Sequence, residues 1–460
     1  MKKLFLFVLA LACMASCAKK QEARTTQHPD FAYDATIYEL NTRQFTPEGT
    51  FVAAEEELPK LKDMGVDIIW IMPIQPIGKI TRKGTLGSYY SIRDYCAFNP
   101  EFGSRADFEH FLAKAHELGM KVILDWVANH TAPDSEWTEN EGWHYRDENG
   151  QLMVQYDWTD IAKLNYENED MRAEMKKAMH WWMDEIGIDG FRCDVAGEVP
   201  TDFWNDAMAE LRLTHPDMFT LAEDEDKAPE LCESAFDMYY GWTLHHLMNG
   251  IAKGENTVED LWEYFAKADT TVEPYAIRMN FISNHDENSW AGDEYERMGA
   301  AVGAMTALTY VIPGMPLIYT GQEYGNHHRL EFFEKDCIDR DEDCRMRPFY
   351  KALNDVRRTN PALFSPELGS PMVRLETDND KVFAIARESA VKQKRMHHYV
   401  TKTNTVLAFI NMSNEVQDVD IHTEAYIDDY MSLDGEMIEV REVMELSLKP
   451  WQYIILTDMD

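Results

Sequence analysis

Four acidic residues follow short apolar runs that are typical of buried strands. They are Asp125 after Val-Ile-Leu, Asp194 after Gly-Phe-Arg-Cys, Glu223 after Phe-Thr-Leu-Ala, and Asp286 after Phe-Ile-Ser-Asn-His. The carboxyl ends of parallel strands in a closed barrel meet at one mouth, so we predict that these side chains converge there. A cationic residue or a histidine stands close to three of the acids, at His130, Arg192 and His285.

Taken alone, each of these acids also fits a helix cap, an ion pair or a strand-end charge. Their recurrence at the ends of successive strands favours catalysis instead. Neighbouring charges and burial move carboxyl pKa values apart, and cleavage of a glycosidic bond needs one ionised carboxylate and one protonated acid. Glycoside cleavage is therefore the chemistry that this set of residues suggests.

The elements that must position these residues are short β-rich runs alternating with helical stretches. The candidate strands are Thr36–Leu40, Asp67–Met72, Lys121–Trp126, Asp189–Val195, Phe219–Glu223, Ala235–Tyr239, Arg278–Ser283 and Pro316–Tyr319. The helical stretches between them include Ser104–Leu118, Asn168–Ile186 and Glu296–Tyr310. This alternation predicts an α/β fold, a (β/α)8 TIM barrel, with a doubly wound parallel sheet as the structural alternative.

Two segments break the alternation. Residues 130–165 are polar, rich in Trp and Tyr, and too long for an ordinary βα loop, so we expect a small inserted domain over the barrel mouth. Residues 365–460 contain strand-like runs without helices between them, which predicts a C-terminal β-sandwich. Within it, the basic segment Lys392–Lys402 is expected to form a hairpin loop. The catalytic barrel is then expected over residues 31–364.

The N-terminus has the pattern of an export signal. Lys2 and Lys3 precede an apolar run that is too short to span a bilayer, and the string Met14-Ala-Ser-Cys17 resembles the lipobox of bacterial lipoproteins. We expect residues 1–16 to be a signal peptide, Cys17 to be the lipidated residue, and residues 17–30 to be a tether. An ordinary cleaved signal with an incidental cysteine is the alternative. The basic residues after Cys17 favour the periplasmic face of an outer membrane over the cell surface.

The net charge and the cysteine spacing limit the classes of partner and of metal site that we expect. The net charge is −38 and no basic stripe is present, which argues against a nucleic-acid partner and leaves membrane contact to the lipid anchor. The five cysteines after Cys17 are an odd number without the spacing of a zinc site. Cys337 and Cys344 flank an acidic segment and are candidates for a disulfide.

Taken together, these stretches resemble the signatures of the α-amylase family of glycoside hydrolases. The signatures that carry the acids read Asp125-Trp-Val-Ala-Asn-His130, Gly190-Phe-Arg-Cys-Asp194, the run that ends in Glu223, and Phe281-Ile-Ser-Asn-His-Asp286. Further matches are Gly65-Val-Asp-Ile-Ile-Trp-Ile-Met-Pro73, Tyr90 with Asp94-Tyr95, and Gly314-Met-Pro-Leu-Ile-Tyr-Thr-Gly-Gln-Glu323. The resemblance covers residues 36–365 and continues weakly into the C-terminal region.

The resemblance implies a catalytic role for three acids. Asp194 would attack the anomeric carbon and form a covalent glycosyl-enzyme. Glu223 would protonate the leaving oxygen and then activate water, and Asp286 would stabilise the distorted sugar through its hydroxyl groups.

The resemblance also implies substrate-binding roles. Arg192 would hold Asp194 ionised and oriented. His130 and His285 would donate hydrogen bonds to hydroxyl groups of the sugar being cleaved. Tyr90 would stack on the apolar face of that sugar, with a place in the packed core as the alternative.

Two segments resemble one branch of the family, the neopullulanases and cyclomaltodextrinases. They are Val195-Ala-Gly-Glu-Val199 and Ile161-Ala-Lys-Leu-Asn165. In other members a Lys-His pair takes the place of Gly197-Glu198, and its histidine helps to bind calcium. Because Glu198 stands here, we expect no metal site and no required cofactor, although oxygen ligands could in principle hold calcium.

The implied function is retaining hydrolysis of α-1,4 and also α-1,6 glucosidic bonds in α-glucans or malto-oligosaccharides. An α-glucosidase or a transglycosylase on the same scaffold is one alternative. A non-catalytic glucan-binding lipoprotein is the other, and the complete set of acids argues against it.

Overall fold

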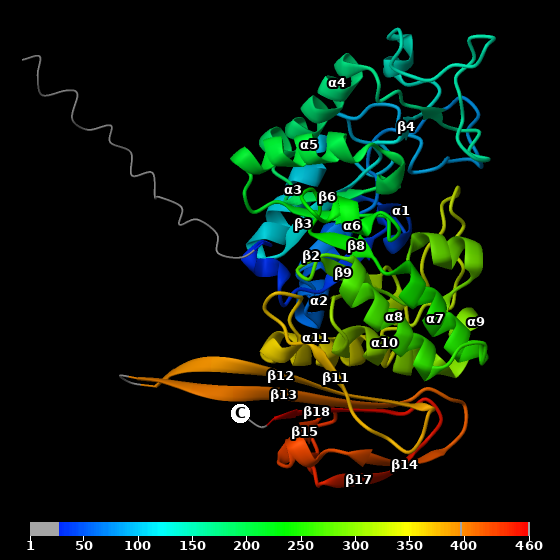
Figure 1. Cartoon of the computed structure of the whole chain (residues 1–460). Helices are drawn as coiled ribbons and strands as arrows, with labels where there is room; N and C mark the ends of the chain where they lie inside the picture. Colours follow the sequence, from blue (N-terminus) through cyan, green and yellow to red (C-terminus); the bar gives the residue numbers. More distant parts are fainter. Residues whose placement is uncertain (1–26, 396–397, 459–460) are drawn as a thin grey trace, which may run out of the picture.

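The structure is a computed structural model that describes residues 27–395 and 398–458, so Cys17 and most of the expected tether lie outside the described residues. Its centre is a closed barrel of parallel strands in the order β1-β10-β9-β8-β7-β6-β3-β2 (Figure 1). The strands are β1 (Ile37–Leu40), β2 (Ile68–Ile71), β3 (Lys121–Trp126), β6 (Gly190–Cys193), β7 (Phe219–Ala222), β8 (Met238–Tyr240), β9 (Ile277–Asn280) and β10 (Met315–Tyr319). The predicted (β/α)8 TIM barrel is confirmed, and β3 has the expected bounds.

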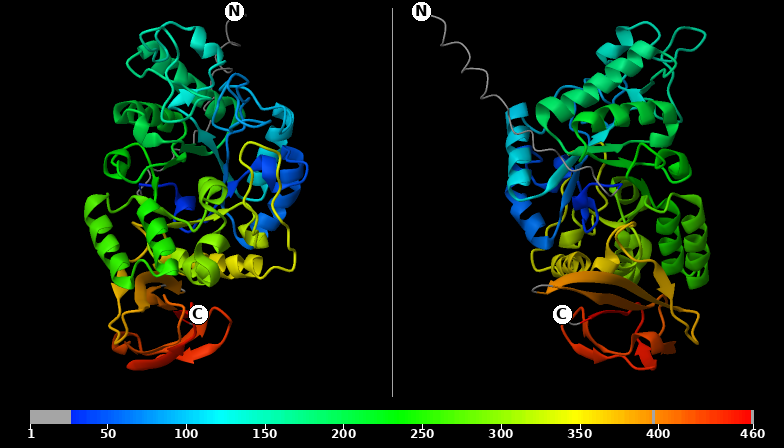
Figure 2. Two further views of the ribbon diagram at one scale, coloured as in Figure 1. Left: turned by 90° about the vertical axis from the view of Figure 1, so that its right-hand side faces the viewer. Right: turned by 60° about the vertical axis from the view of Figure 1, so that its left-hand side comes forward.

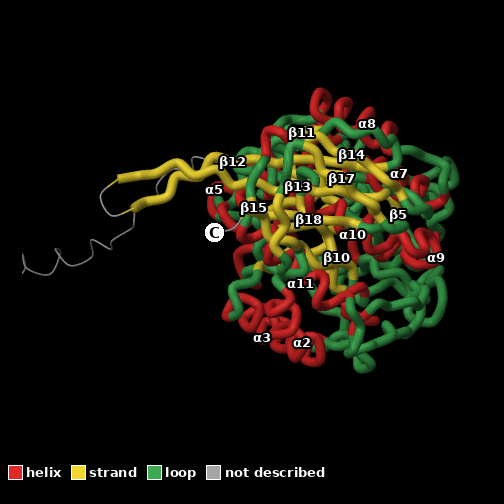
Figure 3. Tube along the Cα trace, turned by 90° about the horizontal axis from the view of Figure 1, so that it is seen from below, coloured by secondary structure: helices red, strands yellow, loops and turns green. Residues whose placement is uncertain are grey.

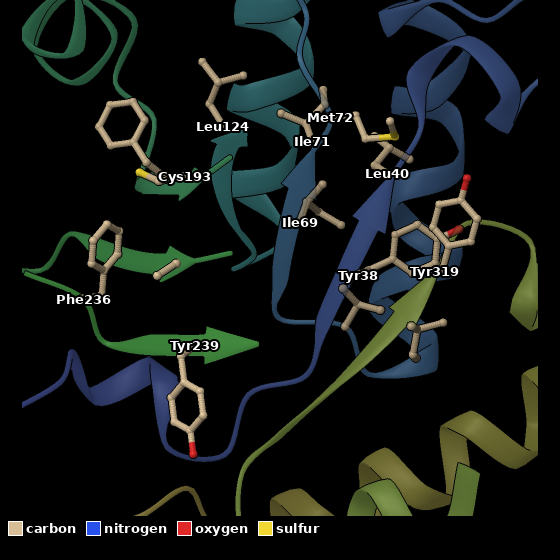
Figure 4. Close-up of a cluster of buried hydrophobic side chains, with 14 of the residues drawn as sticks. Tyr38, Leu40, Ile69, Ile71, Met72, Leu124, Cys193, Phe236, Tyr239 and Tyr319 are labelled. Atoms are coloured by element: carbon tan, nitrogen blue, oxygen red, sulfur yellow. The ribbon is translucent and has the colours of Figure 1, made fainter. Parts of the chain in front are cut away.

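The side chains of the barrel strands alternate between two apolar layers. Ile37, Ile68 and Ile123 pack together inside the barrel. Residues one position along, such as Ile69 and Leu124, pack outward in the layer shown in Figure 4. Because strand side chains alternate with a period of two, every second residue faces the barrel interior up to the mouth.

Helices surround the barrel and cover its outer layer. They are α1 (Thr42–Phe45), α2 (Phe51–Met64), α3 (Arg105–Glu117), α4 (Glu169–His180), α5 (Thr201–Thr214), α6 (Ala228–Leu231), α7 (Trp242–Lys253), α8 (Val258–Thr271), α9 (Glu294–Met298), α10 (Val302–Val311) and α11 (Met346–Thr359). Their starts follow from capping chemistry. Ser104 accepts a hydrogen bond from the Asp107 N–H at the start of α3, and Asp107 bonds back to the Ser104 N–H.

The expectation of a single helix over Glu296–Tyr310 is wrong. Gly299 has a φ of 57° and separates α9 from α10. This conformation is open to glycine and is rarely adopted by other residues, so the chain breaks the helix there. The stretch expected over Asn168–Ile186 is α4 continued by a π-helical turn over Trp181–Ile186, which ends at Gly187 with a φ of 84°.

The segment between β3 and α4 lies over one end of the barrel. It contains the short paired strands β4 (His130–Thr131) and β5 (Ala162–Lys163), in which His130 is opposite Lys163. Figure 2 shows this segment and the C-terminal region at opposite ends of the molecule. The small sheet after β3 agrees with the expected excursion over the mouth.

The C-terminal region consists of antiparallel strands. They are β11 (Met372–Arg374), β12 (Val382–Arg395), β13 (His398–Asn411), β14 (Gln417–His422), β15 (Asp429–Ser432), β16 (Met437–Glu439), β17 (Val443–Leu448) and β18 (Tyr453–Asp458). One sheet has the order β11-β12-β13-β18-β15-β16, and β14 pairs with β17. The Trp262 ring on α8 stacks on Phe383 of β12 with centroids 4.8 Å apart, and so joins this region to the barrel.

The hairpin expected over Lys392–Lys402 is present, but its strands run further into this segment than a loop would allow. The β12–β13 ladder continues from the pair Val382 and Asn411 to the pair Arg395 and His398. Figure 3 shows the two strands extending beyond the body of the molecule. Backbone hydrogen bonds between the strands sustain this arm in a segment without the alternation of apolar residues that marks the other strands.

Two further sequence expectations concern disulfides and membranes. Every cysteine in the described part of the chain is free, so the possible Cys337–Cys344 disulfide is not formed. The Cys344 Sγ instead accepts a hydrogen bond from the Met346 N–H at 3.3 Å. Within residues 27–395 and 398–458, no helix is both long and apolar enough to cross a membrane.

We expect Gly190→Ala to destabilise the barrel. A Cβ at Gly190 would lie 1.9 Å from the Phe219 carbonyl oxygen on the neighbouring strand, and the φ of 150° adds strain for any larger residue. The loss should be roughly 1–3 kcal/mol, measured as the free energy of unfolding in urea. Gly303→Ala is the matched control, because its Cβ would meet only an ordinary contact at 3.5 Å within helix α10. Equal stability of both variants would contradict this account of β6.

Candidate active site

At the mouth of the barrel, charged residues occupy the inward-facing positions of the strands. Glu39 on β1, Asp125 on β3 and Arg192 on β6 are all fully buried at such positions. The register of β6 and β7 pairs Cys193 with Ala222, so the next residues, Asp194 and Glu223, are neighbours at the mouth. The alternation of side chains that packs the core therefore also places the acids together at the barrel mouth.

These residues border a cavity of about 540 Å³. Of the residues singled out from the sequence, the structure brings together along its wall Tyr90, His130, Asp194, Glu223, His285 and Asp286. Arg192 lies beneath them, completely buried. A further cavity of about 490 Å³ lies between α8, β9 and the C-terminal region, but it contains none of these acids.

The Arg192 guanidinium connects three carboxylates. Its Nη1 donates to Asp125 Oδ1 at 2.8 Å and to Asp194 Oδ1 at 3.0 Å, while Nη2 lies 2.8 Å from Glu223 Oε2. The sequence predicted only the contact with Asp194. The pKa of Arg192 is raised well above its usual value, because Asp125 and Glu223 outweigh the effect of burial. The guanidinium therefore remains charged at the base of the site.

Burial shifts both mouth carboxyls in the same direction. It raises the pKa of Asp194, with the Glu223 charge raising it further, and it also raises the pKa of Glu223. Two carboxyls that repel each other in a buried site favour a state that holds one proton between them. Arg192 makes an aligned hydrogen bond to Asp194, whereas its contact with Glu223 is an ion pair without that alignment. The hydrogen bond and charge of Arg192 lower the pKa of Asp194 and so oppose the effect of burial there.

The backbone after Asp194 holds Glu223 in place. The Val195 N–H donates to Glu223 Oε2 at 2.8 Å. Val195 has a φ of 37° and a ψ of 50°, a left-handed conformation that is unusual for a β-branched residue. Strained residues of this kind concentrate at functional sites, where the surroundings enforce the geometry.

His130 is a neutral hydrogen-bond donor at the cavity wall. Burial lowers its pKa to about 4. The Asn129 side-chain amide lies 3.1 Å from Nδ1, so Nδ1 accepts and the ring proton is assigned to Nε2. Nε2 is buried and makes no side-chain hydrogen bond to another described residue, and the ring lies along the cavity wall.

His285 is held in the charged form. Burial lowers its pKa, but Asp286 and Glu39 raise it more strongly, to about 9. Nδ1 lies 2.5 Å from Glu39 Oε1, and Nε2 lies 2.9 Å from the Tyr90 hydroxyl and 3.4 Å from Asp286 Oδ2. Asp286 itself is 38% exposed and reaches the cavity from the loop after β9.

Glu39 is a charged residue of this network that the sequence analysis missed. It lies inside an otherwise apolar strand, one position from the aromatic Tyr38, and no histidine or arginine stands next to it in the sequence. The signal that could have found it is its inward position two residues after Ile37. An acid at such a position is buried and needs a cationic partner.

Tyr90 combines a stacked ring with a fixed hydroxyl group. Its ring lies nearly parallel to Phe332, with 6.3 Å between centroids, and is also stacked on His285. The hydroxyl donates to Asp125 Oδ2 at 3.0 Å. Tyr90 is thus packed into the core of the site and also lines the cavity, and its stacking on a sugar remains a prediction.

Another cavity, the second cavity of the active site, has a volume of about 430 Å³. It adjoins the cavity of about 540 Å³ and shares Trp158, Val195 and Glu223 with it. Its other walls include Tyr156 and Trp242. Glu198 also lines it and accepts a hydrogen bond from the Tyr156 hydroxyl at 2.6 Å. In the described part of the chain, no group of three or more His, Cys, Asp or Glu residues is placed to hold a metal ion. The expectation about calcium remains a prediction.

Residues 31–142 and 135–402 match the family model described as α-amylase, catalytic domain. The chain belongs to the α-amylase family of glycoside hydrolases. Among solved structures of this kind, it is similar to a maltogenic α-amylase from Thermotoga neapolitana, with a TM-score of 0.81 and 26% identity over 92% of this chain and 98% of that one. An α-amylase from Lactobacillus plantarum gives a TM-score of 0.80 and 29% identity over 93% of this chain and 100% of that one.

Relatives in the α-amylase family with assigned names differ in activity. The α-amylase MalA of Haloarcula japonica is 28% identical over 380 residues, which are 78% of this chain and 54% of that protein. An α-1,4-glucan:maltose-1-phosphate maltosyltransferase of Salinibacter ruber is 27% identical over 73% of this chain and 55% of that protein. The chain spans about half the length of these relatives, which include both an amylase and a transferase.

We expect the Glu39→Gln substitution to lower the pKa of His285 from about 9, because it removes one of the two charges that raise it. A raised histidine pKa adds stability that is fully present below the unfolded value near 6.5 and is lost as pH rises through the folded value. Raising the pH from 7 to 10 should therefore lower the Tm of the parent protein more than that of the variant. NMR titration of the His285 ring measures the shift directly.

The matched control for Glu39→Gln is Glu56→Gln, an exposed acid on helix α2. It should leave the His285 titration unchanged. An unchanged His285 midpoint in Glu39→Gln would contradict the role given to Glu39.

Proposed function

We propose that the protein cleaves α-1,4-glucosidic bonds of α-glucans and malto-oligosaccharides with retention of anomeric configuration, and that α-1,6 bonds are further substrates. The observation that carries this proposal is the pair of buried carboxyls Asp194 and Glu223 at a cavity, with Arg192 in contact with both. A buried pair that shares one proton has both forms that glycoside cleavage needs, an ionised nucleophile and a protonated acid.

In the first step, Asp194 attacks the anomeric carbon and Glu223 gives its proton to the leaving oxygen. Arg192 favours the ionised form of Asp194 through its aligned hydrogen bond. As the proton leaves Glu223, the Arg192 Nη2 at 2.8 Å and the Val195 N–H stabilise the carboxylate that forms. The same contacts then support Glu223 as the base that activates water in the second step.

The remaining residues bind the sugar whose anomeric carbon reacts. His130 offers a neutral Nε2–H and His285 a positively charged ring, both suited to hydroxyl groups. Asp286 accepts hydrogen bonds from other hydroxyl groups of this sugar. The Tyr90 ring provides an aromatic surface beside these polar groups, which is the usual complement of a sugar face.

The names of similar proteins support α-glucans as the substrate class, because they include α-amylases and a maltosyltransferase that acts on an α-1,4-glucan. Within the family, we assign the chain to the neopullulanase and cyclomaltodextrinase branch from Gly197-Glu198 and the segment 161–165. Product analysis on cyclodextrin, pullulan and starch tests that assignment, and inactivity on both cyclodextrin and pullulan would contradict it.

Two other functions use the same site. A transglycosylase differs only in the acceptor that resolves the glycosyl-enzyme, and the walls of the second cavity, Tyr156 and Trp242, are aromatic surfaces suited to an acceptor sugar. Products formed with excess maltose separate transfer from hydrolysis. A non-catalytic binding protein would release no reducing sugar from starch.

We expect Asp194→Asn to abolish turnover of every substrate, because no covalent intermediate can form. Glu223→Gln should slow substrates with poor leaving groups far more than an activated aryl glycoside, whose departure needs little protonation. With that glycoside the glycosyl-enzyme should accumulate, and azide should restore turnover because it attacks without a general base. NMR of the first-formed sugar should show retention.

Glu233→Gln is the matched control for these variants, since Glu233 is exposed beyond helix α6 and outside both cavities. It should retain full activity. An inverted product, or an Asp194→Asn enzyme with a near-normal rate, would overturn the roles of both acids.

We further propose that the enzyme is exported and held through Cys17 on an outer membrane, facing the periplasm. Acyl chains contribute about 0.8 kcal/mol per buried CH₂, and stable anchoring needs more than one chain. Cys17→Ala should therefore yield protein that is soluble or unprocessed, as measured by membrane fractionation after a salt wash. Cys13→Ala, at the other cysteine of the leader, should remain anchored. Membrane-bound Cys17→Ala protein would rule out this anchor.

A further inference from the structure

The two cavities lie on opposite sides of the bond that is cleaved. This assignment rests on the proposed function, in which Glu223 protonates the leaving oxygen. The cavity of about 540 Å³ contains Asp194, His130 and His285 and therefore takes the sugar whose anomeric carbon reacts. The neighbouring cavity shares Glu223 but lacks the two histidines, so it takes the leaving group. Residues of the first cavity that lie beyond Tyr90 thus face the non-reducing end of the substrate.

Two loops contact each other at the end of the first cavity that faces the non-reducing end of the substrate. The loop after β2 and the loop that precedes α11 are joined by the Leu86 N–H, which donates to the Phe333 carbonyl at 3.0 Å, and by the Thr85 N–H, which donates to Glu334 at 2.9 Å. At Gly84, a Cβ would lie 2.5 Å from the Phe333 side chain, so the two loops pack as closely as a glycine permits.

A buried arginine fixes both loops from below. The Arg43 Nη1 donates to the Gly87 carbonyl at 3.0 Å and lies 3.4 Å from the Phe332 carbonyl. The same guanidinium forms a two-nitrogen ion pair with Glu101 at 2.7 and 3.0 Å. These contacts anchor the junction of the two loops to the body of the barrel, so the junction forms a fixed wall of the cavity.

Lys83 extends this wall to the segment between β3 and α4. Its Nζ lies 3.3 Å from Asp160 Oδ1, where the aspartate side chain is only 5% exposed, and 5.9 Å from the centre of the Phe333 ring. The Ser91 hydroxyl donates to the Asp160 carbonyl at 2.7 Å and holds that residue in place. Three loops from different parts of the sequence are thereby connected around one end of the cavity.

Aromatic rings line the inner face of the wall. Phe332 lies nearly parallel to Tyr90, and Trp290 packs against Phe332 and Phe333 with centroids 5.4 and 5.7 Å apart. The cavity volume lies in the range of small-molecule pockets, roughly 300–1,000 Å³, and not in that of an extended groove. A cavity of this size suits a short stretch of substrate chain on the side of Asp194 that faces the wall.

We propose that the enzyme acts on chain ends, and that the wall formed by Lys83, Asp160, Phe332 and Phe333 limits the released product to one or two glucosyl residues from the non-reducing end. An internal bond cannot reach Asp194, because the chain beyond the reacting sugar would have to pass through the wall. The leaving group, in contrast, extends freely through the second cavity and can be of any length.

The test compares maltoheptaose with maltoheptaose whose non-reducing end carries a 4,6-O-ethylidene cap, with products separated by chromatography. We expect the free oligosaccharide to lose glucose or maltose stepwise and the capped one to react at least tenfold more slowly. Equal rates, or early products of intermediate length, would overturn the chain-end proposal while leaving the proposed function intact. Cleavage of neither substrate would contradict the proposed function and this inference with it.

A double variant tests whether the wall causes the preference for free chain ends. Lys83→Ala combined with Phe333→Ala should raise the ratio of capped to free cleavage at least tenfold, because it opens the closed end without touching the acids. Lys79→Ala, an exposed lysine of the same loop, should leave that ratio unchanged. An unchanged ratio in a folded double variant would overturn the role of the wall. The measurement on the parent protein stands independently of how the variant folds.

Discussion

The structure of the site depends on one buried guanidinium. Arg192 lies between Asp125, Asp194 and Glu223, and an uncompensated charge at that depth would be costly, since loss of one partner of a buried ion pair typically costs about 3–5 kcal/mol. Arginine suits this place because its planar group presents several donors in a fixed arrangement. Its two terminal nitrogens meet different acids, and the Tyr240 hydroxyl accepts from its Nε at 3.1 Å.

The charges around this guanidinium do not balance, and that imbalance has chemical consequences. Three carboxylates face one arginine, and a little further out the cationic His285 lies between Glu39 and Asp286. Burial makes an additional negative charge unfavourable, so the pair at the mouth favours retention of a proton. The raised pKa of Glu223 thus follows from burial and from the nearby Asp286 charge, without any unusual property of Glu223 itself.

Much of this arrangement could be predicted from the sequence, and the failures have physical reasons. Apolar runs located the barrel strands, and acids at their ends located the mouth. The contact of Arg192 with Glu223 could not be read from either residue, because it arises from the register between two strands. Glu39 was missed because its partner His285 is 246 residues further along the chain. The break at Gly299 and the long β12–β13 arm were missed because a glycine does not always end a helix and because polar strands lack periodicity.

The peptide bond after Asp194 links the position of the Asp194 carboxyl to that of the Glu223 carboxyl. In the proposed reaction Asp194 attacks the sugar, and the N–H of the next residue, Val195, donates a hydrogen bond to Glu223. A thermal displacement of this turn carries both carboxyls in the same direction, so their separation is less sensitive to movement than the position of either one. Asp286 is joined to them by no such short covalent path. The tolerance of the site is therefore tightest between the proposed nucleophile and the proposed acid/base, and looser where a hydroxyl group only has to be held.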